Sequence, residues 1–174
     1  MALSLCLLAA TSFTSQAEDK RPNIVLLLTD DQSYDSVGFS GNTQVKTLNL
    51  DKLAKQGVIF DRAYDTTAIC MASRAQIFTG LYEFKTGANF THGPLTKEKW
   101  QQSYQVKLRE EGYFTGFVGK FGFAVKDEGI DSDQYKDITD LPVSDFDVWY
   151  GWPSQGSYKA VNNVSVAKFA KEHP

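Results

Sequence analysis

The sequence is poor in the residues that build disulfide frameworks and zinc centres. It contains two cysteines and two histidines among its 174 residues. His92 is a lone residue in a polar stretch and His173 is the penultimate residue, so neither fits a Ser/His/Asp triad or a zinc-ligand spacing. Both histidines are expected to be structural or solvated. The sequence therefore indicates neither histidine-based hydrolysis nor a structural zinc site.

The chain also lacks a strong charge of one sign and a long apolar run. Its net charge is −3, from 18 Lys and Arg against 21 Asp and Glu, and there is no basic stripe. That balance argues against nucleic-acid binding. The apolar stretch at residues 3–10 is too short to cross a bilayer as a helix, and no later run is long enough. We therefore expect no nucleic-acid partner and no transmembrane segment.

The first 17 residues predict a signal peptide. The apolar stretch leads through Thr/Ser-rich sequence to Ser15-Gln16-Ala17, which resembles a signal-peptidase site before Glu18. No Lys or Arg precedes the apolar stretch, so a disordered start is the alternative. We expect residues 18–174 to form one exported domain with a modest core. Its destination would be the periplasm or the extracellular space, or the lysosomal and secretory route in a eukaryote.

Apolar runs and helical patterns alternate along the chain. Residues 24–28 form a continuous apolar run, which predicts a strand buried on both faces. A helix is expected over residues 48–56, ended by Gly57, and a second strand at 58–60. Further expected elements are a helix starting at 73–78, a helix at 97–110, a strand at 113–118, a polar loop at 126–140 and a helix at 161–172. This order predicts an α/β fold with a largely parallel central sheet flanked by helices.

Charged side chains follow two of the predicted strands. Asp30 and Asp31 come directly after the first strand, and Lys120 follows the third. Ligand-binding groups collect at the carboxyl ends of strands in such folds. Adjacent carboxylates repel each other, and a divalent cation such as Ca²⁺ or Mg²⁺ is their natural counter-charge. The alternatives are that Asp30 caps a turn and that Asp31 and Lys120 are solvated.

Cys70 is the single cysteine of the expected mature chain, so it has no intramolecular disulfide partner. Its neighbours Thr66, Thr67, Ser73 and Arg74 are polar, and it stands where a helix is expected to begin. A helix N-terminus favours a thiolate or another anion, and Arg74 offers a bidentate donor. The residues alone indicate a reactive thiol or an anion site. The alternative is a buried, inert cysteine.

Three segments in this order resemble the N-terminal part of type I sulfatases, the formylglycine-dependent members of the alkaline phosphatase superfamily. They are residues 21–25 leading to Asp30-Asp31, Cys70-Met71-Ala72-Ser73-Arg74 followed by Thr79-Gly80, and residues 112–115 leading to Gly119-Lys120. Residues 146–151 match more weakly. The resemblance covers most of the chain from residue 21 to about 151. It implies that residues 18–174 are the N-terminal portion of a sulfatase catalytic domain.

The resemblance implies a sulfuric ester hydrolase acting on a sulfated carbohydrate or on an aryl or alkyl sulfate. A maturation enzyme would convert Cys70 to formylglycine, whose hydrate attacks sulfur and then releases sulfate through its second hydroxyl. Asp30, Asp31 and residue 70 would bind Ca²⁺, with Mg²⁺ possible. Lys120 would bind the sulfate group and stabilise its charge, and Arg74 would orient residue 70.

The sequence departs from the family pattern in two respects. Family members often carry a histidine two residues after the lysine, where this chain has Gly122. The family's later metal ligands, further Lys and His residues and C-terminal subdomain are not present, so a fragment of a longer protein is expected. Two alternatives are a phosphonate or phosphate ester hydrolase of the same superfamily and an inactive, truncated binding protein. Trp149, Tyr150 and Trp152 are expected to pack in the core rather than to stack on sugars.

Overall fold

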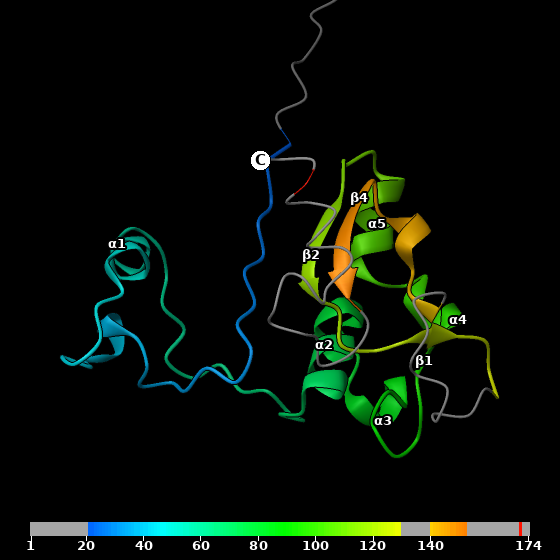
Figure 1. Ribbon diagram of the computed structural model, residues 1–174, viewed down its shortest axis with the longest axis horizontal. Coiled ribbons are helices and arrows are strands. Elements are labelled where there is room, and N and C mark those ends of the chain that lie inside the picture. Colours follow the sequence, from blue (N-terminus) through cyan, green and yellow to red (C-terminus); the bar gives the residue numbers. More distant parts are fainter. Residues whose placement is uncertain (1–20, 130–139, 153–170, 172–174) are drawn as a thin grey trace, which may run out of the picture.

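The structure is a computed structural model that describes residues 21–129, 140–152 and 171. Figure 1 shows the arrangement of its elements. The helices are α1 (Leu48–Gln56), α2 (Cys70–Thr79), α3 (Glu83–Thr86), α4 (Lys97–Trp100) and α5 (Tyr104–Glu110), with 3₁₀ turns η1 (Gly38–Ser40) and η4 (Val143–Asp145). The strands are β1 (Leu95–Thr96), β2 (Gly116–Lys120), β3 (Val125–Lys126) and β4 (Val148–Trp152). The predicted signal peptide and nearly all of the predicted helix at 161–172 lie outside the described residues. Within the described part, no helix is long and apolar enough to cross a membrane.

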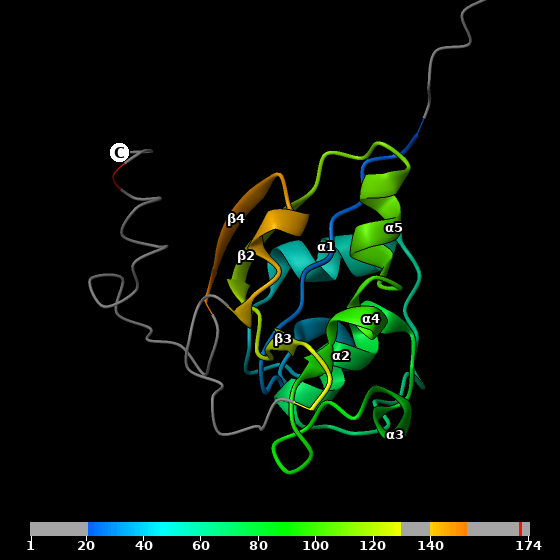
Figure 2. The same cartoon turned by 90° about the vertical axis from the view of Figure 1, so that its right-hand side faces the viewer.

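The strands of the described part form two parallel pairs. β2 pairs with β4 over five positions, from Gly116 opposite Val148 to Lys120 opposite Trp152. β1 pairs with β3 over two positions. Figure 2 shows α2, α4 and α5 on one side of the β2–β4 pair. Helices and parallel strands in one chain confirm the predicted α/β class.

The hydrophobic core is aromatic and lies between α2, α4 and the β2–β4 pair. Trp100, Phe121 and Phe123 are 1%, 0% and 0% exposed. The Phe121 and Phe123 ring centroids are 4.2 Å apart, and Trp100 meets Phe121 edge-on at 5.6 Å. Trp149 stacks on Phe117 at 4.9 Å against this cluster. The ring contacts of Trp149 agree with the core role expected for it.

α2 forms because one face of its sequence is apolar and a glycine follows it. Met71, Ala75 and Phe78 recur at helical spacing and are buried. Gly80 ends the helix in the left-handed conformation, with φ 69°, and its N–H bonds to Gln76 O. The helix predicted to start in the region 73–78 is confirmed, and its first residue is Cys70.

The single helix predicted at 97–110 is wrong, because the structure has two helices there. Ser103 adopts an extended backbone conformation, and its hydroxyl accepts a hydrogen bond from Val106 N as the N-cap of α5. Thr96 caps α4 in the same way. Serine and threonine favour such caps because the side-chain oxygen satisfies a helix N–H that has no partner within the helix. The break leaves Trp100 and Tyr104 both in contact with Phe78, at 5.3 and 5.2 Å.

The strands predicted at 24–28 and 58–60 are wrong. Neither segment is a strand in the structure, and Val25, Leu27 and Phe60 are 80%, 79% and 78% exposed. A strand buried on both faces needs a paired neighbour and a covering layer. Residues 23–28 instead face β2 across an open pocket of about 660 Å³. The helix predicted at 48–56 is confirmed as α1, but no residue of it is buried.

Asp147 ties the start of β2 to the start of β4. Its Oδ2 accepts hydrogen bonds from Thr115 N at 2.7 Å and from Thr115 Oγ1 at 3.1 Å. Arg109 Nη2 lies 3.4 Å from Oδ1. The bonds from Thr115, assisted by Arg109, lower the pKa of Asp147 below its ordinary value. The strand predicted at 113–118 spans residues 116–120 in the structure, and the Thr115 carbonyl just before it accepts hydrogen bonds from the N–H groups of residues 147 and 148.

We expect Asp147→Asn to reduce the loss of stability at acid pH. Because the folded pKa is depressed, the carboxylate stabilises the fold fully above the unfolded pKa. That contribution disappears as pH falls from the ordinary carboxyl range through the lower folded pKa. Urea unfolding gives the free energy of unfolding at pH 7 and at pH 3. The difference between these two free energies should be smaller in the variant than in the unmodified chain. The control is Glu98→Gln, which removes an exposed carboxylate of α4. A pH dependence equal to that of the unmodified chain would contradict the role of Asp147.

Candidate active site

Cys70 is the first residue of α2 and is partly buried. The preceding residue, Ile69, is extended and supplies no side-chain cap to the helix. The first N–H groups of a helix have no partner within it, and the first turn of α2 carries no acidic residue to offset its partial positive charge. Cys70 therefore stands at the start of a helix, as the sequence predicted, where the helix end favours an anion. Its reactivity stays a prediction.

Arg74 lies one helical turn after Cys70, on the same side of α2. Its side chain is 10% exposed. Nη1 donates a hydrogen bond to the carbonyl oxygen of Lys120 at 2.8 Å, and Nη2 lies 3.7 Å from Oδ1 of Asp30. A buried guanidinium is costly unless it is paired, and these contacts supply its partners. Arg74 thus joins the start of α2 to the end of β2.

Lys120 is the last residue of β2, and its side chain is 8% exposed. Its Nζ lies 2.8 Å from Oδ2 of Asp30. The strand end is fixed from the other side by β4, because Lys120 pairs with Trp152 and Phe121 N donates to Trp152 O. The structure therefore brings Asp30, Arg74 and Lys120 together, although 90 residues separate Asp30 from Lys120.

The Asp30 carboxylate is held in its charged form by the two cations. The hydrogen bond from Lys120 is the largest cause that lowers the pKa of Asp30, and the charges of Lys120 and Arg74 add to it. Partial burial opposes this shift. The Asp30 side chain is 31% exposed, so solvent screens the pairs. Net charge at this cluster is positive, with one carboxylate against two cations.

Asp31 lies on an exposed turn with φ 53°, a left-handed conformation that is uncommon for a residue other than glycine. Two adjacent carboxylates have the oxygen chemistry that Ca²⁺ takes, but they would supply only part of its shell of about six to eight ligands. Among the described residues, no three His, Cys, Asp or Glu side chains gather closely enough to hold a metal. Asp30 and Asp31 therefore fit a metal site in chemistry, as one portion of its ligand set.

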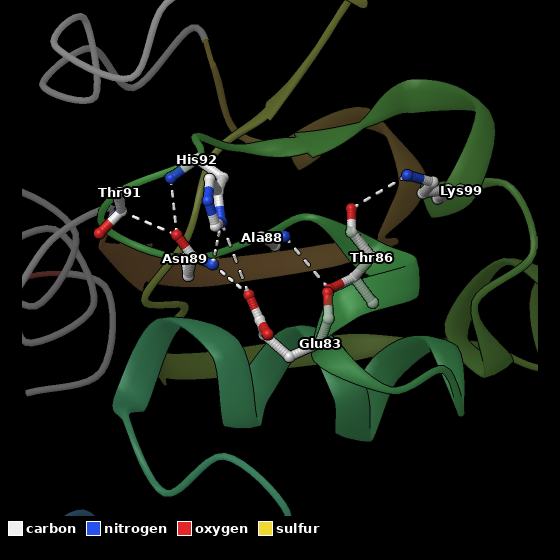
Figure 3. A network of polar contacts seen from close by, with 7 residues as sticks. All are labelled: Glu83, Thr86, Ala88, Asn89, Thr91, His92 and Lys99. Carbon is white, nitrogen blue, oxygen red and sulfur yellow. Dashed lines mark hydrogen bonds and ion pairs between the residues drawn. The ribbon is translucent and has the colours of Figure 1, made fainter.

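A second polar network folds the loop after α3 (Figure 3). Asn89 Oδ1 accepts from Thr91 N at 2.8 Å and from His92 N at 2.6 Å. Its amide nitrogen lies 2.8 Å from Nδ1 of His92 and also bonds to Glu83. These bonds give His92 a structural place in the loop, as the sequence indicated.

The contact between Arg74 and the Lys120 carbonyl could not be predicted from the sequence, because main-chain acceptors leave no signature there and 46 residues separate the two partners. The sequence also indicated no role for the absence of a side chain at Gly122. Gly122 has φ 87°, and a Cβ there would lie 2.7 Å from Cδ of Arg74.

The chain matches one family model and several curated proteins. The Sulfatase family model matches residues 22–170. The chain is 33% identical to an N-acetylglucosamine-6-O-sulfatase of Bacteroides thetaiotaomicron, over 71% of this chain and 22% of that protein. It is 30% identical to human arylsulfatase D over 87% of this chain and 26% of that protein, and 37% identical to an ulvan-active sulfatase of Formosa agariphila over 61% and 21%. The chain thus spans about a fifth to a quarter of the length of these relatives.

Proposed function

The chain belongs to the sulfatase family, and we propose that it is the nucleophile-bearing N-terminal part of an enzyme that hydrolyses sulfuric esters. The observation that carries the proposal is the convergence of Arg74 and Lys120 on Asp30, where Arg74 follows Cys70 by one turn of α2. Two cations beside a helix N-terminus suit a substrate that carries a negative charge next to the bond to be broken.

Cys70 is the proposed site of the nucleophile, after conversion to formylglycine by a maturation enzyme. Hydrated formylglycine would supply one hydroxyl that attacks sulfur as the S–O bond to the departing alcohol breaks. Loss of the proton from the second hydroxyl would then expel sulfate and re-form the aldehyde. The position of residue 70 at the start of α2 supports this role, because the N-terminal end of a helix favours negative charge there. Arg74 follows on the same side of the helix and orients residue 70.

Lys120 is the proposed sulfate-binding residue. Its ammonium group is nearly buried beside Asp30 at the paired end of β2, which supports this role because the charge is held in one place. Preorganised charge of this kind stabilises a developing negative charge better than mobile water does. Asp30 and Asp31, with residue 70, would hold Ca²⁺ or Mg²⁺, which supplies Lewis-acid polarisation when bound. In this structure Asp30 pairs with Lys120 and Arg74.

The proposed substrate is a sulfated carbohydrate, small or polymeric, or an aryl or alkyl sulfate. Two of the relatives named above carry the name of a carbohydrate and one is named an arylsulfatase. These names support a sulfate ester as the substrate but do not select between a carbohydrate and an aryl sulfate. We further propose that residues 1–17 are a signal peptide and that the protein is exported to the periplasm, the extracellular space or the secretory pathway. Residues 18–174 would then be the N-terminal portion of the catalytic domain.

A comparison of sulfate and phosphate esters tests the proposed reaction. The full-length protein, coexpressed with a formylglycine-generating enzyme and supplied with Ca²⁺, is expected to hydrolyse an aryl sulfate with kcat/KM at least about 100-fold above that for the matching aryl phosphate, a difference of roughly 2.7 kcal/mol. A preference for the phosphate would favour the phosphate and phosphonate ester alternative. Turnover of neither ester by protein that carries formylglycine would favour an inactive binding protein.

A further inference from the structure

Gly122 lies under the side chain of Arg74. Its backbone has φ 87°, and a Cβ built there would stand 2.7 Å from Cδ and 3.3 Å from Nε of Arg74. Carbon atoms in contact prefer separations of roughly 3.5–4.0 Å, so a methyl group at this position and the present Arg74 side chain exclude each other. The same Cβ would lie 3.7 Å from Cε of Lys120, which is ordinary contact. The conflict is therefore with Arg74.

The backbone at Gly122 has little freedom to withdraw. Phe121 and Phe123 flank it, and both are fully buried in the aromatic core with ring centroids 4.2 Å apart. Phe121 N also donates to Trp152 O at 3.1 Å, which fixes this segment to the end of β4. Closely packed cores resist such shifts. A side chain at position 122 would move Arg74 rather than the main chain.

In the structure, the side chain of Arg74 lies against residue 122 while its guanidinium contacts the Lys120 carbonyl and Asp30. A displaced Arg74 would give up the 2.8 Å hydrogen bond to Lys120 O and the 3.7 Å contact to Asp30. The hydrogen bond that connects α2 to the end of β2 would then be lost.

We propose that Gly122 is a positioning residue, whose missing side chain lets Arg74 cross the main chain and set the arrangement of Arg74, Lys120 and Asp30. The catalytic consequence rests on the proposed function of this cluster. The packing relation between Gly122 and Arg74 does not depend on that function and is tested separately.

A double-mutant cycle on stability tests the packing relation. Gly122→Ala is made in the full chain and in its Arg74→Ala variant, with Gly119→Ala as the matched control. Gly119 also has a positive φ, 109°, but a Cβ there would meet only a Trp152 ring atom at 3.9 Å. We expect Gly119→Ala to lower Tm by roughly 2–4 °C through backbone strain, and Gly122→Ala by roughly twice as much.

With Arg74 already replaced by alanine, Gly122→Ala should cost no more Tm than Gly119→Ala, because the clashing Cδ is gone. An equal Tm loss for Gly122→Ala in both backgrounds would overturn the proposal. If Gly122→Ala alone fails to fold, the double variant is expected to fold, and failure of both would equally overturn it.

Turnover of the aryl sulfate tests the catalytic consequence. Gly122→Ala is expected to lower kcat at least about tenfold with a smaller change in KM, and to lower it no further in protein that carries Arg74→Ala. Full kcat in folded Gly122→Ala would overturn the positioning role. An inactive parent enzyme would defeat the proposed sulfatase function, and the stability cycle would still decide the relation between Gly122 and Arg74.

Discussion

Replacement of Cys70 by alanine should lower the turnover of an aryl sulfate by at least about three orders of magnitude, because the loss of the proposed covalent nucleophile would remove the reaction path itself. The fold should survive, since Cys70 is only partly buried at the first position of α2. Initial rates of the full-length protein, coexpressed with a formylglycine-generating enzyme, measure the effect. Peptide mass spectrometry across residue 70 of the parent should show the mass decrease of thiol-to-aldehyde conversion.

Cys70→Ser is the informative companion variant. A serine hydroxyl at position 70 can attack sulfur and release the alcohol, but it has no second hydroxyl through which to expel sulfate. The variant should therefore release about one equivalent of alcohol per site and stop, with the sulfate group covalently attached to residue 70. Undiminished turnover by Cys70→Ala would show that Cys70 is the inert cysteine of the alternative interpretation.

Trp100→Ala should destabilise the chain by about 3–5 kcal/mol, the cost of a large aromatic deletion in a packed core. Trp100 is 1% exposed and contacts the rings of Phe78, Phe121 and Phe146. Its Nε1 also donates to Oδ2 of Asp145 at 2.6 Å, so the substitution removes a partner from the η4 turn as well. Chemical denaturation of the full chain gives the free energy of unfolding.

Two matched variants separate the contributions at Trp100. Trp100→Phe keeps most of the ring contacts and loses the bond to Asp145, so it should cost about 1.5–3 kcal/mol. Phe84→Ala removes an aromatic ring that is 73% exposed and should change stability by no more than about 0.5 kcal/mol. If Trp100→Ala lowers the free energy of unfolding as little as Phe84→Ala does, the result would contradict the placement of Trp100 in the hydrophobic core.

Local sequence signals predicted α1 together with its end at Gly57. The end of α2 at Gly80 was not predicted, although Gly80 adopts the left-handed backbone, φ 69°, that glycine favours after a helix. The break between α4 and α5 was not predicted, since the spacing of Trp100 and Tyr104 by four residues fits one continuous helix. The break is made by Ser103, which is the N-cap of α5. The sequence alone does not show whether a serine within a helical pattern lies inside one helix or caps the next.

The strands at 24–28 and 58–60 failed for a different reason. An apolar run indicates that a segment favours burial. Whether both of its faces are buried depends on the strands and helices that pack beside it. The described residues place no paired strand beside either segment. The predicted closeness of Asp30 to Lys120 nevertheless appears, with a 2.8 Å contact between their charged groups. What these residues do in catalysis stays a prediction.

The edge of β2 that faces residues 23–28 affects how the chain behaves in solution. β2 pairs with β4 along one edge, and its other edge faces the open pocket and the exposed apolar run. Val118 on β2 is 74% exposed, and Val25 of the apolar run, which lines the same pocket, is 80% exposed. A strand edge beside an uncovered apolar segment is the arrangement through which separate molecules add to one another edge to edge. A chain of this length kept by itself is therefore expected to self-associate as its concentration rises.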